Sequence, residues 1–300
     1  MDRDLLIHLP VILTVARRAG FAAAASELGM SPSAVSHAVR LVEERLGVPL
    51  FARTTRSVAL TEAGRALVEA AAPALRDIGE RVERIRAAKG RVGGLLRLNV
   101  PNAALPILTP VVGEMAKRFP GVTVEIYADD AIVDIVAAGF DAGARLGEMI
   151  AEDMIATRLT PPFAAIIVAS PAYLAARGRP QGIADLKDHN CIAYRMITGG
   201  GLYRWELVDG EREVTVEGAG STIVNHTLYA RDLALAGVGL AYLFEPLVRA
   251  DIAAGRLTQV LPETALEEPG LFLYYPKRAA LAPKLRAFID TAREVLRERE

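Results

Sequence analysis

The alternation of hydrophobic and polar positions predicts a compact helical unit over residues 9–60. Proline is tolerated in a first helical turn, so Pro10 predicts the start of a helix that ends at Gly20. Phe21–Leu28 has the spacing of a short second helix, and Gly29 stops it. A tight turn then leads to a third helix.

This third helix begins at Ser31, a good N-cap, and its apolar residues share one face that predicts core: Val35, Val39, Val42 and Leu46. The other face presents a polar row that suits a major groove: Ser33, Ser36, His37 and Arg40. Free N–H groups at the helix start, next to Ser31, favour a phosphate. A solvated helix face is the alternative, which the preceding helix and following hairpin disfavour.

Two short apolar pieces, Leu50–Phe51 and Val58–Leu60, enclose a polar segment and predict a hairpin wing. The wing residues that suit phosphates or a minor groove are Arg53, Thr54, Thr55 and Arg56. Polar residues are also usual at any exposed turn, so an ordinary hairpin tip remains the alternative.

A long helix is predicted from Thr61 to about Lys89, and Pro73 should kink or delay it. Its apolar stripe is Leu67, Ala71, Leu75, Ile78, Val82 and Ile85. The spacing at the end of this stripe is that of a coiled coil, which predicts a dimer seam at Leu75, Ile78, Val82 and Ile85. Packing of the stripe within its own domain is the alternative.

Beyond a hinge at Gly90–Gly94, predicted strands and helices alternate, which favours a mainly parallel sheet with helices on both faces. The expected elements are strands 95–100, 122–128 and 140–146 and helices 106–119 and 132–139. A second set follows, with strands near 163–169, 191–195, 221–225, 238–244 and 257–261 and a hairpin turning at Asp209-Gly210. The last strand, 271–275, and a helix from about Ala282 return to the first set.

The predicted domains are therefore a DNA-binding domain (1–61), a linker or dimerisation helix with its hinge (62–91), and a two-lobed domain (92–300). Lobe 1 covers about 92–162 and 268–300, and lobe 2 covers about 163–267. Two lobes joined by crossing strands make a cleft.

Composition narrows the class of protein. With 300 residues, 52% hydrophobic and 24% charged, the chain is expected to fold fully and to contain several domains. Residues 1–91 hold 14 Lys/Arg against 10 Asp/Glu, and the remainder holds 21 against 26, a weak indication that the N-terminal part meets a polyanion. The apolar stretch Leu233–Phe244 is too short to span a membrane, and the N-terminus has no secretory pattern, so we expect a cytoplasmic protein.

No catalytic or metal-binding pattern is found in the sequence. One cysteine, Cys191, excludes an internal disulfide, and the four histidines lack ligand spacing, so we expect no metal and no cofactor. Gly237-Val238-Gly239 lacks the third glycine of a dinucleotide fingerprint, and Gly199-Gly200-Gly201 lacks the Lys-Ser/Thr of a phosphate loop. Ser221 lacks the flanks of a nucleophile elbow, so the chain is not expected to be an enzyme.

The N-terminal residues resemble the signature of the LysR-type transcriptional regulators over about 45 positions. The segments that carry the resemblance are Phe21, Ala24-Ala25, Leu28, Ser31–Arg40, Glu43, Leu46–Phe51 and Leu60–Gly64. The C-terminal part is similar to the family's periplasmic-binding-protein-like effector domain at Asp141–Gly147, Ser170–Leu174, Tyr203–Glu206 and Tyr274–Pro276. The resemblance implies an α+β multidomain protein, with a mainly α winged helix-turn-helix, a long linker helix and a two-lobed α/β domain.

A periplasmic binding protein would explain only residues 92–300 and would need an export signal, so a DNA-binding regulator is the better hypothesis. Its expected partners are double-stranded DNA with a dyad-symmetric operator, a small polar or anionic effector, and further copies of the chain as a dimer or dimer of dimers. RNA polymerase is a further candidate partner, and no membrane is expected.

Effector-binding residues are expected where strand ends and helix N-termini converge on the cleft. The candidates are Pro101, Asn102, Ala103, Arg145, Ser170, Arg195, Asn225 and His226. A surface salt bridge or hinge contact is an equally weighted alternative for either arginine, and His226 could serve only as a helix cap.

Overall fold

The computed structural model describes residues 3–53, 58–87, 92–146 and 154–297. The chain divides into two compact units, Met1–Lys89 and Gly90–Glu300, and each is described by itself.

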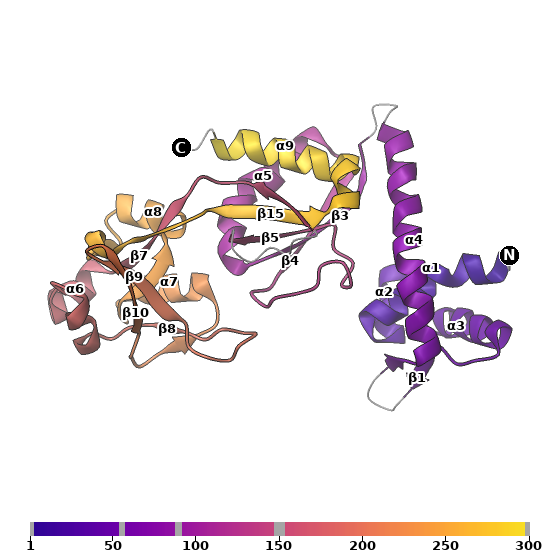
Figure 1. Cartoon of the computed structure of the whole chain (residues 1–300), viewed down its shortest axis with the longest axis horizontal. Helices are drawn as coiled ribbons and strands as arrows, with labels where there is room; N and C mark the ends of the chain where they lie inside the picture. Colours follow the sequence, from indigo (N-terminus) through magenta and orange to yellow (C-terminus); the bar gives the residue numbers. More distant parts are fainter. Residues whose placement is uncertain (1–2, 54–57, 88–91, 147–153, 298–300) are drawn as a thin grey trace. The chain divides into compact units, whose positions relative to one another are not determined.

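The first unit contains three helices, a two-stranded wing and a long helix (Figure 1). Its elements are α1 (Arg3–Arg18), α2 (Phe21–Leu28), α3 (Pro32–Leu46), β1 (Phe51–Arg53), β2 (Val58–Leu60) and α4 (Glu62–Ala87). Gly29 and Gly47 end α2 and α3 in the left-handed conformation, with φ of 63° and 70°. The core of the unit includes Ile12 and Val15 of α1 and three of the residues expected on the buried face of α3, Val35, Val39 and Val42. The fourth, Leu46, is 41% exposed at the end of α3, so the expectation that it is a core residue is wrong.

Two further expectations for this unit are wrong. Helix α1 begins seven residues before Pro10, which lies inside it. Proline here removes one backbone donor, but the packing of apolar residues on both sides of it maintains the helix. Helix α4 begins at Glu62 and continues through Pro73 to Ala87, so the expectation that the proline delays the helix is wrong.

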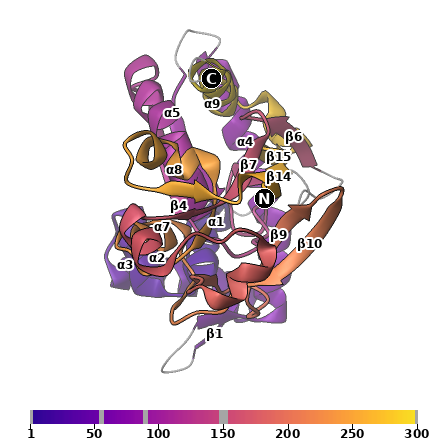
Figure 2. The same cartoon turned by 90° about the vertical axis from the view of Figure 1, so that its left-hand side faces the viewer.

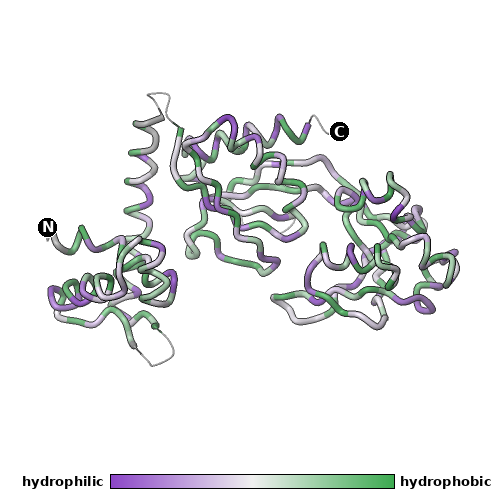
Figure 3. Tube along the Cα trace, turned by 180° about the vertical axis from the view of Figure 1, so that it is seen from behind, coloured by the Kyte–Doolittle hydropathy of each residue, from purple (hydrophilic) through white to green (hydrophobic). Residues whose placement is uncertain are grey.

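The second unit has two lobes, and hydrophobic segments (green in Figure 3) recur in both of them. Lobe 1 contains a five-stranded sheet in the order β4-β3-β5-β15-β6. Its strands are β3 (Gly94–Val100), β4 (Val122–Ala128), β5 (Ala142–Leu146), β6 (Met154–Arg158) and β15 (Leu271–Pro276). Helices α5 (Leu105–Arg118) and α9 (Pro283–Arg297) lie together against one face of this sheet (Figure 1).

Lobe 2 is built on β7 (Phe163–Ala169), to which three strands pair: β12 (Ala241–Phe244), β13 (Thr258–Val260) and β14 (Leu266–Glu268). Helices α6 (Pro171–Arg177), α7 (Thr227–Leu235) and α8 (Glu245–Ala253) belong to this lobe. A long hairpin is formed by β9 (Arg204–Asp209) and β10 (Arg212–Glu217) (Figure 2). The short parallel pair β8 (Ala193–Tyr194) and β11 (Ile223–Val224) completes the lobe.

The expectation of a mainly parallel sheet is correct for β3 with β4 and β5, and the short pair β8 and β11 is also parallel. In lobe 2 all three pairings to β7 are antiparallel, and β15 is antiparallel to both its neighbours. The predicted helix over 132–139 is also wrong. The Asp134 carboxylate accepts hydrogen bonds from the N–H groups of Val136 and Ala137, which favours a turn, and Gly139 has a φ of 76°.

The two chain segments that connect the lobes contact each other beside Gly270. The N–H groups of Leu159 and Thr160 both donate to the carbonyl of Leu271, and the Leu271 N–H donates to Thr160 Oγ1 at 2.8 Å. Gly270 has a φ of 93°, and a Cβ there would lie 2.5 Å from the carbonyl oxygen of Pro161. Only glycine therefore fits this crossing without moving the backbone.

A buried ionic cluster in lobe 2 gives a testable stability term. The Asp251 side chain is 1% exposed and accepts hydrogen bonds from Arg231 Nε at 2.6 Å and Arg256 Nε at 2.9 Å. Burial alone raises the pKa of Asp251, but these hydrogen bonds and charges outweigh burial and hold the pKa below its ordinary value of 3.8.

We expect Asp251→Asn to lower the free energy of unfolding at pH 7 by about 1–3 kcal/mol, because both arginines remain partly solvated after the loss. A lowered pKa in the folded state stabilises the fold above the unfolded pKa and loses that effect as the pH falls through the folded pKa. The difference in free energy of unfolding between the wild type and Asp251→Asn should therefore shrink below about pH 3.8. Urea unfolding of the wild type and the variant, at pH 7 and at a pH below the ordinary pKa of an aspartate, measures this difference in stability. Equal stability of the two proteins at pH 7 would refute the expectation.

Candidate DNA-binding and effector sites

The predicted polar row of α3 faces away from the core of its unit. Ser33, His37 and Arg40 are exposed and Ser36 is partly exposed, whereas Val35 on the opposite face is fully buried. Ser31 is the N-cap of α3, and its Oγ accepts from the Ala34 N–H at 3.1 Å. The side chain of Ser31 thus already has a local role, and Ser33 lies beside it with an Oγ–Oγ distance of 2.9 Å.

The wing is held against the end of α3 by Glu43. Its carboxylate accepts from the N–H groups of Leu50 and Phe51 at 2.7 and 3.1 Å, and strand β1 then pairs antiparallel with β2. Arg53 ends β1, opposite Val58, and its side chain is not described. The other predicted wing residues, Thr54, Thr55 and Arg56, lie outside the described residues.

A cavity of about 230 Å³ lies where residues of both lobes meet. Lobe 1 contributes Pro101, Ala103, Asp130, Ile132 and Arg145. Lobe 2 contributes six aromatic side chains: Phe163, Tyr194, Tyr203, Trp205, Tyr242 and Phe244. A mainly apolar cleft with a few polar groups is the usual form of a small-molecule site.

Arg145 is the buried cation of this cleft, with 6% of its surface exposed. Its Nη1 donates to the carbonyl of Ala144 at 2.7 Å, and its Nη2 donates to Asn99 Oδ1 and to the carbonyl of Ala131, each at 2.8 Å. Among the described residues, Asn99 Nδ2 is a fully buried donor with no hydrogen-bond partner. The guanidinium therefore links β3, β5 and the segment that follows β4.

Asp130 is the acidic group of the same cleft. It accepts from the Asn102 N–H at 2.8 Å, from Asn102 Nδ2 at 2.9 Å and from Tyr194 Oη at 2.9 Å. Because Tyr194 belongs to lobe 2, this carboxylate joins the lobes across the cleft. Burial and then the charge of Asp130 raise the pKa of Tyr194, so the phenol remains a donor at neutral pH.

Comparisons with known proteins agree on one family. Residues 6–65 match the model described as "Bacterial regulatory helix-turn-helix protein, lysR family", and residues 89–297 match "LysR substrate binding domain". The chain belongs to the LysR family of transcriptional regulators.

A "Putative transcriptional regulator" of Pseudomonas aeruginosa is 39% identical over 286 residues, which cover 94% of this chain and 92% of the relative. The "HTH-type transcriptional regulator PgrR" of Escherichia coli is 38% identical over 291 residues, 97% of each protein. The solved structure of CrgA, a LysR-type transcriptional regulator from Neisseria meningitidis, is 28% identical, with a TM-score of 0.63 and 99% of both chains covered.

The resemblance stated from the sequence is thus confirmed. The chain is a LysR-type DNA-binding transcriptional regulator with an effector-binding regulatory domain, and its relatives are regulators rather than enzymes. LysR regulators bind DNA and small-molecule effectors and form oligomers. No helix among the described residues of this regulator is both long and apolar enough to cross a membrane.

Of the eight effector-site residues expected from the sequence of this LysR-type regulator, Pro101, Ala103 and Arg145 line the cleft. Asn102 instead holds Asp130 in place. The other four do not line the cleft: Ser170, Arg195, Asn225 and His226.

Three of these four residues make local hydrogen bonds outside the cleft. Ser170 caps α6 by accepting from the Tyr173 N–H at 3.2 Å, and His226 caps α7 through Nδ1. Arg195 is exposed and donates to the carbonyl of Gly200 at 2.7 Å, and Asn225 is exposed. The capping alternative raised for His226 is the contact that the structure shows.

Sequence reasoning missed Asp130 and the aromatic wall. Asp130 is the second residue after β4, so the rule that strand ends meet at a cleft could have indicated it. The aromatic residues come from distant strands of lobe 2, and only the Tyr203–Glu206 segment had drawn attention, through its family resemblance. No local pattern signals that these rings share a wall.

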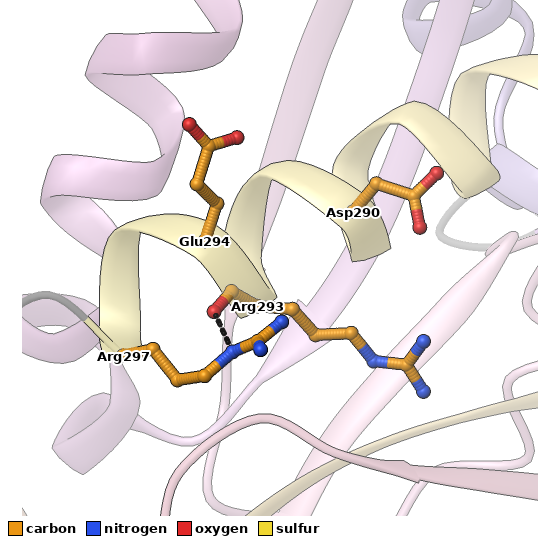
Figure 4. A pocket seen from close by; sticks show the side chains of 4 residues that line it. All are labelled: Asp290, Arg293, Glu294 and Arg297. Carbon is orange, nitrogen blue, oxygen red and sulfur yellow. Dashed lines mark hydrogen bonds between the residues drawn. The ribbon is translucent and has the colours of Figure 1, made fainter.

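Two other hollows of the regulatory domain are weaker candidates. One, of about 510 Å³, is lined by side chains of a single helix, α9, and Figure 4 shows Arg297 donating to the carbonyl of Arg293. Its Glu294 already pairs with Arg118 of α5 at 2.9 Å. The other, of about 570 Å³, lies by α6, where the Tyr173 hydroxyl bonds His189 and Asn190 within the lobe.

The apolar stripe of α4 is buried or partly buried in the first half of the helix and exposed in the second. Ala71 is buried, and Leu67 packs against the core of the first unit. Ile78, Val82 and Ile85 are exposed by 58%, 40% and 66%. Within the described chain, the second half of the stripe is therefore apolar surface.

Proposed function

We propose that this regulator recognises a dyad-symmetric operator as a dimer or dimer of dimers, with α3 in the major groove and the wing on the adjacent backbone. The observation that supports this best is the exposed row Ser33, His37 and Arg40, which lies opposite the buried face of α3. Arginine can bond guanine through two parallel hydrogen bonds, whereas wing arginines suit phosphates.

The cleft between the lobes is, in the same proposal, the effector site. A ligand there would touch both lobes and favour one angle between them, and so change the spacing of the paired DNA-binding units. We further propose that the protein acts in the cytoplasm, where DNA and RNA polymerase are its partners.

Two arginine variants test the proposed DNA contacts. Arg40→Ala should lower operator affinity by about 1–3 kcal/mol and reduce discrimination at one base pair. Arg53→Ala should weaken binding to all sequences and lower the slope of log affinity against log salt by about one. Fluorescence anisotropy with operator and scrambled duplexes, at several salt concentrations, measures both effects.

Arg177→Ala is the matched control, because it removes an exposed arginine from α6 in the regulatory domain. Its DNA affinity should equal that of the wild type. If Arg40→Ala and Arg53→Ala also bind every duplex as the wild type does, the assignment of α3 and the wing to DNA is wrong.

A further inference from the structure

The rings of the cleft wall are nearly parallel. The centroids of Trp205 and Tyr242 are 5.6 Å apart with an interplanar angle of 18°, and Tyr203 lies 6.3 Å from Tyr242 at 22°. All three rings line the cleft. Aromatic faces prefer offset-stacked partners, so a flat ring is the ligand shape that extends this stack.

The hydrogen bonds of Arg145 decide what kind of polar group it can bind. A guanidinium grips a carboxylate with two parallel N–H groups, either Nη1 with Nη2 or Nε with Nη2. Both edges include Nη2, which already donates to Asn99 and to Ala131. Three of its five N–H groups are used in the described contacts, which leaves Nε–H and one N–H of Nη1. These two lie on different edges of the guanidinium, so they cannot hold both oxygens of one carboxylate in parallel.

Asp130 places an opposite charge in the same cleft. It accepts three hydrogen bonds, and a carboxylate has about four acceptor sites, so roughly one remains for a ligand. An anionic ligand would approach this carboxylate, and a cationic ligand would approach the buried Arg145. Either charge also loses its hydration on entering an apolar cleft.

We propose that the effector is an uncharged, planar molecule of one or two rings, whose polar end carries an acceptor for Arg145 and a donor for Asp130. This rests on the proposed effector role of the cleft. The volume of about 230 Å³ sets the size, because it is below the roughly 300–1,000 Å³ of typical sites for drug-sized ligands. The inference narrows the polar or anionic effector expected from the sequence to a neutral polar one.

Three probes of the same shape test the charge of the ligand. Benzoate, benzamide and benzamidine share a ring and a planar head group, but they are anionic, neutral and cationic at neutral pH. Trp205 is the one tryptophan of the sequence, is 1% exposed and lines the cleft, so its fluorescence reports occupancy. Titrating the full-length chain, we expect the dissociation constant for benzamide to be at least about tenfold lower than for either charged probe.

Three variants locate and explain the response. Tyr203→Leu removes a ring of the wall and should weaken benzamide binding about tenfold, whereas Tyr229→Leu, on the exposed side of α7, should not change it. Asp130→Asn removes the negative charge and should shift the preference about tenfold toward benzoate. Circular dichroism checks that each variant is folded.

The outcomes separate this inference from the proposed function. Tighter binding of benzoate or benzamidine than of benzamide to the wild type, lost in Tyr203→Leu, would overturn the neutral class and leave the cleft as the effector site. No fluorescence response to benzamide up to roughly 10 mM would overturn the inference as well. Equal responses in the wild type and Tyr203→Leu would overturn both, because the probes would then bind elsewhere.

Discussion

Replacing Gly64 with alanine is expected to destabilise the DNA-binding unit severely and to weaken operator binding. Gly64 is buried near the start of α4, and a Cβ there would lie 2.0 Å from the carbonyl oxygen of Leu50. That oxygen belongs to the backbone and also accepts from the Thr61 N–H at 2.9 Å, so it cannot move without disturbing the join between wing and helix.

The expected cost is about 3 kcal/mol, the upper range for overpacking. The core of a small unit supplies only about 3–5 kcal/mol of net stability, so about 0–2 kcal/mol would remain and the ratio of unfolded to folded molecules would rise more than about a hundredfold. Hydrogen exchange followed by mass spectrometry should show fast exchange in peptides from α2 and α3, with the regulatory domain still protected.

Gly79→Ala is a control on the same helix. Nothing lies within 4 Å of a Cβ at Gly79, so alanine there should stabilise α4 by about 1 kcal/mol through helix propensity alone. The two substitutions should therefore have opposite signs. Wild-type exchange and DNA affinity in Gly64→Ala would show that the wing and α4 do not pack as described.

The double change Ile78→Asp with Val82→Asp is expected to convert the regulator to a monomer. Both side chains are exposed in the single chain, and their spacing is that of a coiled-coil seam. Burying two carboxylates of each subunit in an apolar seam costs several kcal/mol of association free energy. A dimer held by this seam would not persist after such a loss. Loss of the dimer should in turn reduce affinity for a two-half-site operator about a hundredfold or more, since each half-site is then bound alone.

Light scattering coupled to size exclusion measures the mass of the variant. Ile78→Leu with Val82→Leu keeps the apolar surface and should remain associated. If the aspartate variant keeps both its assembly and its DNA affinity, the exposed half of the α4 stripe is not the seam, and another surface joins the subunits.

Local signals in the sequence were sufficient to place α3 in the first unit. Ser31 and Pro32 start α3, Gly47 ends it, and the apolar spacing of Val35, Val39 and Val42 identifies its buried face. These features act within one helix, so they can be recognised without knowing the fold. The start of α1 could not be placed, because packing of residues before Pro10 outweighs the local preference of proline.

Strand directions and the segment 132–139 depended on distant partners. The direction in which β7 pairs with another strand depends on the path of the chain between the two. Paired residues of β7 and β12, for example, are more than 70 positions apart in the sequence. The helical spacing of Ile132, Ile135 and Val136 was real, but the Asp134 side chain provides the turn with its own hydrogen bonds.

Only part of the candidate cleft could be predicted from the sequence, because the rest depends on residues that are distant along the chain. Residues that directly follow a strand, such as Pro101, could be placed at the cleft from the sheet rule alone. Ser170 and His226 satisfy that rule equally well and yet cap helices, because the same residue types serve both purposes. The stacked rings of Trp205 and Tyr242 come from separate strands of lobe 2 and needed the three-dimensional fold.

The most direct test of the account is the affinity of the full-length chain for the DNA upstream of its own gene, measured by anisotropy at several salt concentrations. A duplex of equal length and composition with scrambled sequence is the comparison. The account predicts binding to the natural duplex at least about a thousandfold tighter near physiological salt, with a negative salt slope for both duplexes. Equal affinity for the two duplexes at every salt concentration would contradict it.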